Sequence, residues 1–177
     1  MAEPGQEAAL ARPPRVLTRI NAPLARYGAY LSVAGLLVIV AIVAFQVFGR
    51  YVLNSSPTWT ENLALVLILY VTMIGAAVGV RDAGHIGMDS ILILVPEKVR
   101  RWAEMLIHVL VALFGIAMIW NGWILGMSVA PYKLSNINLS EGYRYVPLVV
   151  SGAMIILFSI EHLIALVQRT EVEPAWH

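Results

Sequence analysis

The sequence contains no cysteine and few charged side chains. Of its 177 residues, 13% are charged and 59% are hydrophobic, whereas about 25% of the residues in an average soluble domain are charged. Without cysteine the chain can form no disulfide, thiolate metal site or cysteine nucleophile. The low charge argues against a soluble globule, a disordered chain and a coiled coil. The net charge of +1 gives no reason to expect a nucleic-acid partner.

Motifs of catalysis are also missing. The sequence has no glycine-rich phosphate loop, no His-Glu-x-x-His zinc motif and no serine nucleophile elbow. We therefore expect neither an enzyme nor a bound cofactor or metal.

Four long apolar segments lie between the charged residues, and each is long enough to cross a bilayer, which takes roughly 20 residues in a helix. Their apolar residues run consecutively rather than alternating, which favours helices over the strands of a barrel. The sequence therefore predicts an all-α membrane protein with four transmembrane helices. We expect spans at about 24–48, 61–80, 102–127 and 146–168, with polar tails at 1–21 and 169–177.

The positive charges predict the orientation of these spans. Nine of the 12 Lys and Arg residues fall in the two tails, at the start of the first span or in the second loop. Because Lys and Arg are enriched in cytoplasmic loops, both termini and the second loop are predicted to be cytoplasmic. Within that loop the apolar stretch 86–95 is too short to span, so we expect it to form a short helix in the membrane interface.

Ionisable residues within or beside the spans are the candidate functional residues. Arg50 and Glu61 bracket the first outer loop, and a salt bridge between them is the simpler interpretation, with docking of an outside partner as the alternative. Trp59 is either an interfacial anchor or part of that docking surface.

Three further ionisable residues lie about two turns from the cytoplasmic ends of the third and fourth spans. They are His108, Glu161 and His162, and we expect them to form a polar clamp between helices rather than a proton path. Depth along the antiparallel helices predicts that Glu161 lies opposite His108, with His162 directed about 100° away.

Two glycine pairs spaced four residues apart offer small faces for close helix packing. They are Gly75 with Gly79, which we also expect to face another subunit, and Gly122 with Gly126.

The combined motifs resemble those of a known family. An Arg-Tyr-x-x-Asn segment at Arg50 is followed by Trp59-Thr60-Glu61, then by a Gly-Ala-rich helix end, Arg81, His85-Ile86 and Asp89. A Pro with a basic run at 96–101 follows, and residues 143–147 resemble a Tyr-x-x-Pro region that opens the last helix. This stretch resembles the small membrane subunit of tripartite ATP-independent periplasmic (TRAP) transporters. Asn62 stands where the family pattern has a second acid, so Glu61 is the one acid there.

The resemblance implies a multi-pass protein of the bacterial inner membrane. Its partners would be a large membrane subunit that carries the sodium and substrate sites, a periplasmic substrate-binding protein, and membrane lipids. The complex would import organic acids, driven by an ion gradient, mainly sodium, and this subunit would scaffold the large one and help dock the binding protein. The residues implied in assembly or docking are Arg50, Trp59, Glu61, Arg81, His85 and Asp89.

Two other functions fit parts of the sequence. His108 and His162 lie at similar depth and could be axial ligands of a haem, which would make the chain a membrane anchor of a respiratory complex. A small exporter that works alone as a homodimer is the other alternative. The resemblance favours the transporter subunit over both.

Overall fold

The computed structural model describes residues 15–55, 57–82, 96–134 and 139–168. These residues form four long helices and one short 3-10 helix, η1. The elements in chain order are α2 (Arg15–Tyr51), α3 (Thr58–Asp82), α5 (Glu97–Val129), η1 (Glu141–Arg144) and α6 (Val146–Gln168). The predicted interfacial helix at 86–95, with His85 and Asp89, lies outside the described residues.

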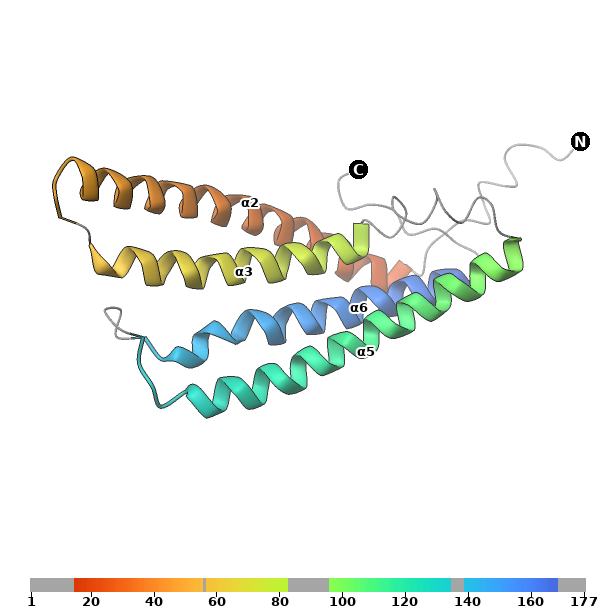
Figure 1. Ribbon diagram of the computed structural model, residues 1–177. Coiled ribbons are helices and arrows are strands. Elements are labelled where there is room, and N and C mark those ends of the chain that lie inside the picture. The colour runs from red at the N-terminus through yellow and green to blue at the C-terminus, as the bar shows by residue number, and fades with distance from the viewer. Residues whose placement is uncertain (1–14, 56, 83–95, 135–138, 169–177) are drawn as a thin grey trace, which may run out of the picture.

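Each long helix is apolar and long enough to cross a membrane. The prediction of an all-α protein with four spans is therefore confirmed. The start of α2, the end of α3, the start of α5 and the end of α6 meet at one end of the molecule, here called the terminal end (Figure 1). The α2–α3 connection and η1 lie at the opposite end, here called the loop end. The cytoplasmic location of the terminal end stays a prediction.

The helices are arranged as two antiparallel hairpins, α2 with α3 and α5 with α6, and α3 packs against α6 to join them (Figure 1). Across the molecule the order is thus α2, α3, α6, α5. Helix α6 is central, since half of its span is buried, compared with 6% of the span of α2. The core between the hairpins consists of Ala25, Ile74, Ala77, Val78, Met118, Met154, Ile155 and Phe158.

Glycines set the closest approach, between α5 and α6. A Cβ placed on Gly152 would lie 2.8 Å from the carbonyl oxygen of Gly115, and one on Gly115 would lie 2.9 Å from that of Gly152. Only residues without side chains allow two backbones to come this near. The predicted glycine Gly122 also faces α6, where its Cβ would lie 3.0 Å from Val149, and Gly126 faces Tyr145.

The other predicted glycine pair lies on α3. A Cβ on Gly75 would be in ordinary contact with Ser32 of α2, at 3.5 Å from its Oγ. Among the described residues, nothing lies within 4 Å of a Cβ on Gly79. Gly75 therefore faces α2, whereas a side chain at Gly79 would contact no described residue.

Helix α2 begins earlier than the apolar run. It starts at Arg15, inside the predicted polar tail, and it continues through Pro23. Hydropathy marks only the part of a helix that sits in hydrocarbon, so a polar first turn is invisible to it. The difference matters because Asn21, assigned to the tail by sequence, is buried in the structure.

Candidate functional site

A buried ion pair joins α3 to α6 near the terminal end. Arg81 lies in the last turn of α3, where a basic side chain is favourable because it faces the negative end of the helix dipole. Its Nε lies 3.2 Å from Oε2 of Glu161, and neither side chain is exposed. Its Nη1 lies 3.2 Å from Oδ1 of the neighbouring Asp82. The single guanidinium therefore holds two carboxylates inside the protein.

Helix α2 contributes an amide to the same carboxylate. Nδ2 of Asn21 donates to Oε2 of Glu161 at 2.9 Å and to the carbonyl of Leu157 at 3.3 Å. The carboxylate of Glu161 thus receives hydrogen bonds from α2 and α3 while belonging to α6. A buried carboxylate is tolerated only with such partners, because losing its hydration costs several kcal/mol.

The histidines connect α3 to α5 through α6. Nε2 of His162 lies 2.9 Å from the carbonyl oxygen of Arg81. A carbonyl only accepts, so Nε2 carries the proton and donates. This carbonyl is among the last four of α3, which have no partner within the helix. The ring of His162 also stacks on that of His108 in α5, with centroids 4.5 Å apart and planes within 5°.

These six residues, Asn21, Arg81, Asp82, His108, Glu161 and His162, are called the polar cluster. All are buried, and they come from all four helices. Within the described residues, Nη2 of Arg81 and Oε1 of Glu161 have no hydrogen-bond partner. The arrangement suits a clamp that fixes helix positions.

The outer loop lacks the predicted salt bridge. Arg50 and Glu61 are both exposed, and neither forms an ion pair with any described residue. The prediction of a salt bridge that fixes this hairpin is therefore wrong. Backbone contacts close the connection instead: the amide of Ser55 donates to the carbonyl of Gly49 at 3.0 Å, and Asn54 takes the left-handed conformation at φ 46°. Both charged side chains remain available to a partner.

Comparison with known proteins identifies the family. Residues 39–169 match the family described as "Tripartite ATP-independent periplasmic transporters, DctQ component". The chain belongs to this family.

Relatives of the chain carry matching names. It is 23% identical to the sialic acid TRAP transporter small permease protein SiaQ of Vibrio cholerae, over 73% of this chain and 75% of that protein. It is 22% identical to a putative TRAP transporter small permease protein of Haemophilus influenzae, over 74% of this chain and 81% of that protein. A third match is 37% identical and covers 41% of this chain but only 12% of the sialic acid TRAP transporter permease protein SiaT of Haemophilus influenzae.

This DctQ-family protein is thus a small membrane subunit of a TRAP transporter and a multi-pass protein of the inner membrane. Its relatives are named as components of transporters rather than as enzymes.

The haem alternative does not fit the histidines of this DctQ-family chain. Two axial ligands must each point a ring nitrogen at one iron from opposite sides. Here the two rings lie face to face in contact, and Nε2 of His162 is already bonded to the carbonyl of Arg81.

The predicted clamp residues lie together, but with different partners. The sequence predicts that Glu161 faces His108 and that His162 points about 100° away. In the structure His108 stacks on His162, and the hydrogen bonds of Glu161 come from α2 and α3. The reason is that α6 lies between α3 and α5, so adjacent residues of α6 face different helices. Arg81, implied in docking, has a fully buried side chain inside the chain. Trp59 is 43% exposed at the loop end, two residues before Glu61.

Two members of the polar cluster escaped sequence reasoning. Asp82 is adjacent to Arg81, and a pair of opposite charges at the end of an apolar span is a sequence feature that could have predicted its role. The corresponding feature for Asn21 is weaker. Asn21 is a polar residue four positions before Ala25, which is buried on the same face of α2.

Proposed function

We propose that this small subunit braces the large membrane subunit of a TRAP importer that takes up organic acids with a sodium gradient. The observation that best supports this proposal is that the polar cluster is buried among the helices of this chain. Glu161 is the charged residue within the fourth span, and its side chain is entirely covered by neighbouring helices. A group covered in this way holds helices together and does not line a path for solute. We therefore assign the transport of the solute to the large membrane subunit.

The proposed contact surface for the large subunit is the α3 stripe, defined as Glu61, Leu65, Ile68, Thr72, Ala76 and Gly79. The first five residues of the stripe are exposed, at spacings of three and four. Glu61 and Gly79 are 18 residues apart, which is about five full turns, so the stripe runs straight along the helix. Its terminal end is built of small residues, the kind that membrane helices use for close packing.

The names of the relatives support the partner and the substrate class. One of them is a longer permease protein in which a stretch related to this chain forms a small part. Others are named for sialic acid and for C4-dicarboxylates, both of which are carboxylic acids. We infer that this transporter likewise handles carboxylates and receives them from a periplasmic binding protein. Arg50, Trp59 and Glu61 form the proposed docking surface for that protein, because they are exposed at the loop end.

Gly79→Leu tests the brace. Since the described residues leave space at Gly79, the variant should fold alone yet fail to co-purify with a tagged large subunit, and reconstituted vesicles should lose sodium-driven uptake. Ala117→Leu is the matched control, because Ala117 is an exposed small residue of α5. Normal assembly of both variants would reject the α3 stripe as the contact. Uptake by the large subunit without this chain would reject the bracing function itself.

A further inference from the structure

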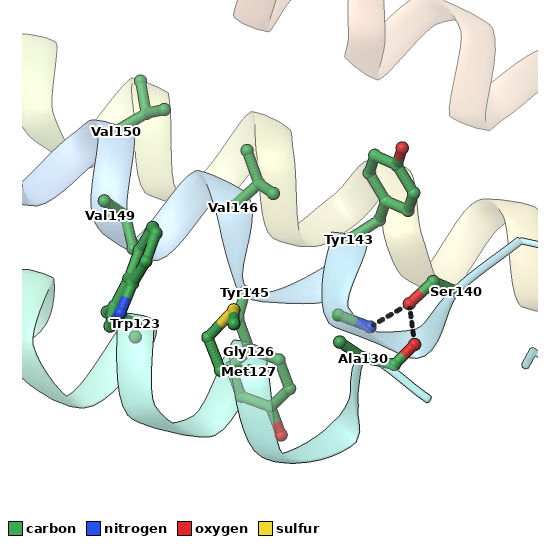
Figure 2. Close-up of a pocket in the computed structure, with 12 residues that line it drawn as sticks. Trp123, Gly126, Met127, Ala130, Ser140, Tyr143, Tyr145, Val146, Val149 and Val150 are labelled. Carbon is green, nitrogen blue, oxygen red and sulfur yellow. Dashed lines mark hydrogen bonds between the residues drawn. The ribbon is translucent and has the colours of Figure 1, made fainter. Parts of the chain in front are cut away.

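An apolar groove lies between α5 and α6 at the loop end. It has a volume of about 340 Å³ and is bounded by Trp123 and Met127 of α5 and by Val146 and Val150 of α6. Figure 2 shows these side chains along the groove, together with Tyr143 and Tyr145 of the η1 region.

Glycines create the groove. Gly122 and Gly126 of α5 and Gly142 of η1 line it without contributing side chains. A Cβ on Gly142 would lie 2.9 Å from the carbonyl oxygen of Gly126, so η1 lies directly on the α5 backbone. The missing side chains leave a crevice beside this contact that no residue of the described chain fills.

Several polar groups of the groove are bonded within the chain. Oγ of Ser140 donates to the carbonyl of Ala130 at 2.7 Å and accepts from the amide of Gly142 at 3.3 Å (Figure 2). The carbonyl of Tyr143 accepts from the hydroxyl of Tyr70 in α3 at 3.0 Å. With these groups satisfied, the walls present mainly hydrocarbon and aromatic surface. The matching occupant is an aliphatic chain.

The surroundings indicate a lipid rather than a protein helix. The open face of α5 carries large exposed side chains, namely Trp102, Leu106, Leu110, Leu113, Phe114, Trp120 and Trp123. Close contacts between membrane helices favour small residues instead. Exposed Trp and Tyr at the groove also match the aromatic belt that forms at the level of lipid headgroups.

We propose that this groove holds one acyl chain of a phospholipid from the leaflet at the loop end, which is the periplasmic leaflet in the predicted topology. Bilayer tails are as apolar as the groove, so the hydrophobic effect does not drive entry. Dispersion contacts do, because an empty groove leaves its lining atoms without neighbours on one side. The proposal depends on the membrane location of the chain and not on its bracing function.

Native mass spectrometry of the intact subunit, extracted in mild detergent from membranes of natural phospholipids, tests the proposal. The wild type should retain one phospholipid. Val150→Trp and Val146→Trp place an indole in the groove and should lose that phospholipid. Ile124→Trp is the matched control, because Ile124 is exposed on α5 but does not line the groove, and it should retain the lipid.

Two checks keep the result decisive. Circular dichroism identifies a variant that has lost its helices, and either groove variant alone suffices if it stays folded. Equal lipid retention by the wild type, both groove variants and the control would overturn the proposal, as would the absence of lipid from the wild type. A cysteine at Val150 that cross-links to the large subunit in the assembled transporter would also overturn it, because a protein side chain would then be the occupant.

Discussion

At the scale of single residues, Arg81 connects three other members of the polar cluster, Asp82, Glu161 and His162. It binds two carboxylates and offers its carbonyl to His162. Removing one partner of a buried ion pair leaves the other charge without compensation, which typically costs about 3–5 kcal/mol. We expect Arg81→Met to lower the melting temperature of the purified subunit far more than Arg100→Met. The latter breaks a partly exposed pair with Glu104, and exposed pairs contribute only about 0–1 kcal/mol.

A second substitution separates the ion pair from other roles of Arg81. Replacing a whole buried pair by apolar residues is often nearly neutral. Arg81→Met combined with Glu161→Met should therefore recover much of the stability lost by Arg81→Met alone. If thermal unfolding shows no recovery, the contact of Arg81 with Asp82 is the important one.

The two histidines should respond differently to the same change. Phenylalanine preserves a flat ring in the stack but cannot donate a hydrogen bond. At residue 162 it leaves the carbonyl of Arg81 without its donor, and a buried orphan of this kind costs about 1–3 kcal/mol. His162→Phe should thus lower the melting temperature more than His108→Phe. Equal losses would mean that ring stacking, rather than the hydrogen bond, is what the histidines contribute.

The sequence proposes residues for a polar clamp at this scale, but it does not give their partners. Depth along a helix gives the level of a side chain in the membrane, and this is the basis on which His108, Glu161 and His162 are expected near one another; in the structure His108 stacks on His162, and Glu161 binds Arg81. Which neighbour each one faces depends on the order of the helices across the molecule, and hydropathy carries no information about that order. Asn21 was missed for a related reason, since its helix begins before the apolar run does.

At the scale of helices, the contact between Gly115 and Gly152 fixes the α5–α6 hairpin. Alanine at residue 152 would bring its Cβ against a backbone oxygen, which cannot move aside as a flexible side chain can. Overpacking of this kind typically costs about 1–3 kcal/mol. We expect Gly152→Ala to reduce the thermal stability of the subunit and Gly79→Ala to leave it nearly unchanged. A tolerated Gly152→Ala would show that the hairpin can open without loss.

The helices themselves were largely predictable, since long uncharged runs require spans and leave few alternatives in a membrane. The residues at which the helices begin and end were less predictable. Helix α5 starts at Glu97, before the predicted span, because its first turn is charged and extends out of the hydrocarbon. The absence of an Arg50–Glu61 pair was not predictable either, because it depends on which faces α2 and α3 present at the loop end.

At the scale of the whole molecule, the orientation in the membrane can be tested directly, because the chain has no cysteine. Tyr132→Cys introduces a thiol at an exposed residue of the loop end, and Glu171→Cys introduces one in the C-terminal tail. In intact cells whose outer membrane has been made permeable, a thiol reagent that cannot cross the inner membrane should label Cys at 132 and not at 171. The reverse pattern would contradict the orientation predicted from the Lys and Arg distribution.

The polar cluster draws its members from the first, second, third and last helices, and this has a consequence for biosynthesis. A ribosome delivers Arg81 to the membrane roughly eighty residues before Glu161 emerges. During that interval the guanidinium has Asp82 beside it, but its Nε lacks the acceptor that Glu161 later provides. The last helix therefore completes the site that the second helix began. A chain truncated before α6 would leave the Nε of Arg81 without its acceptor inside the membrane.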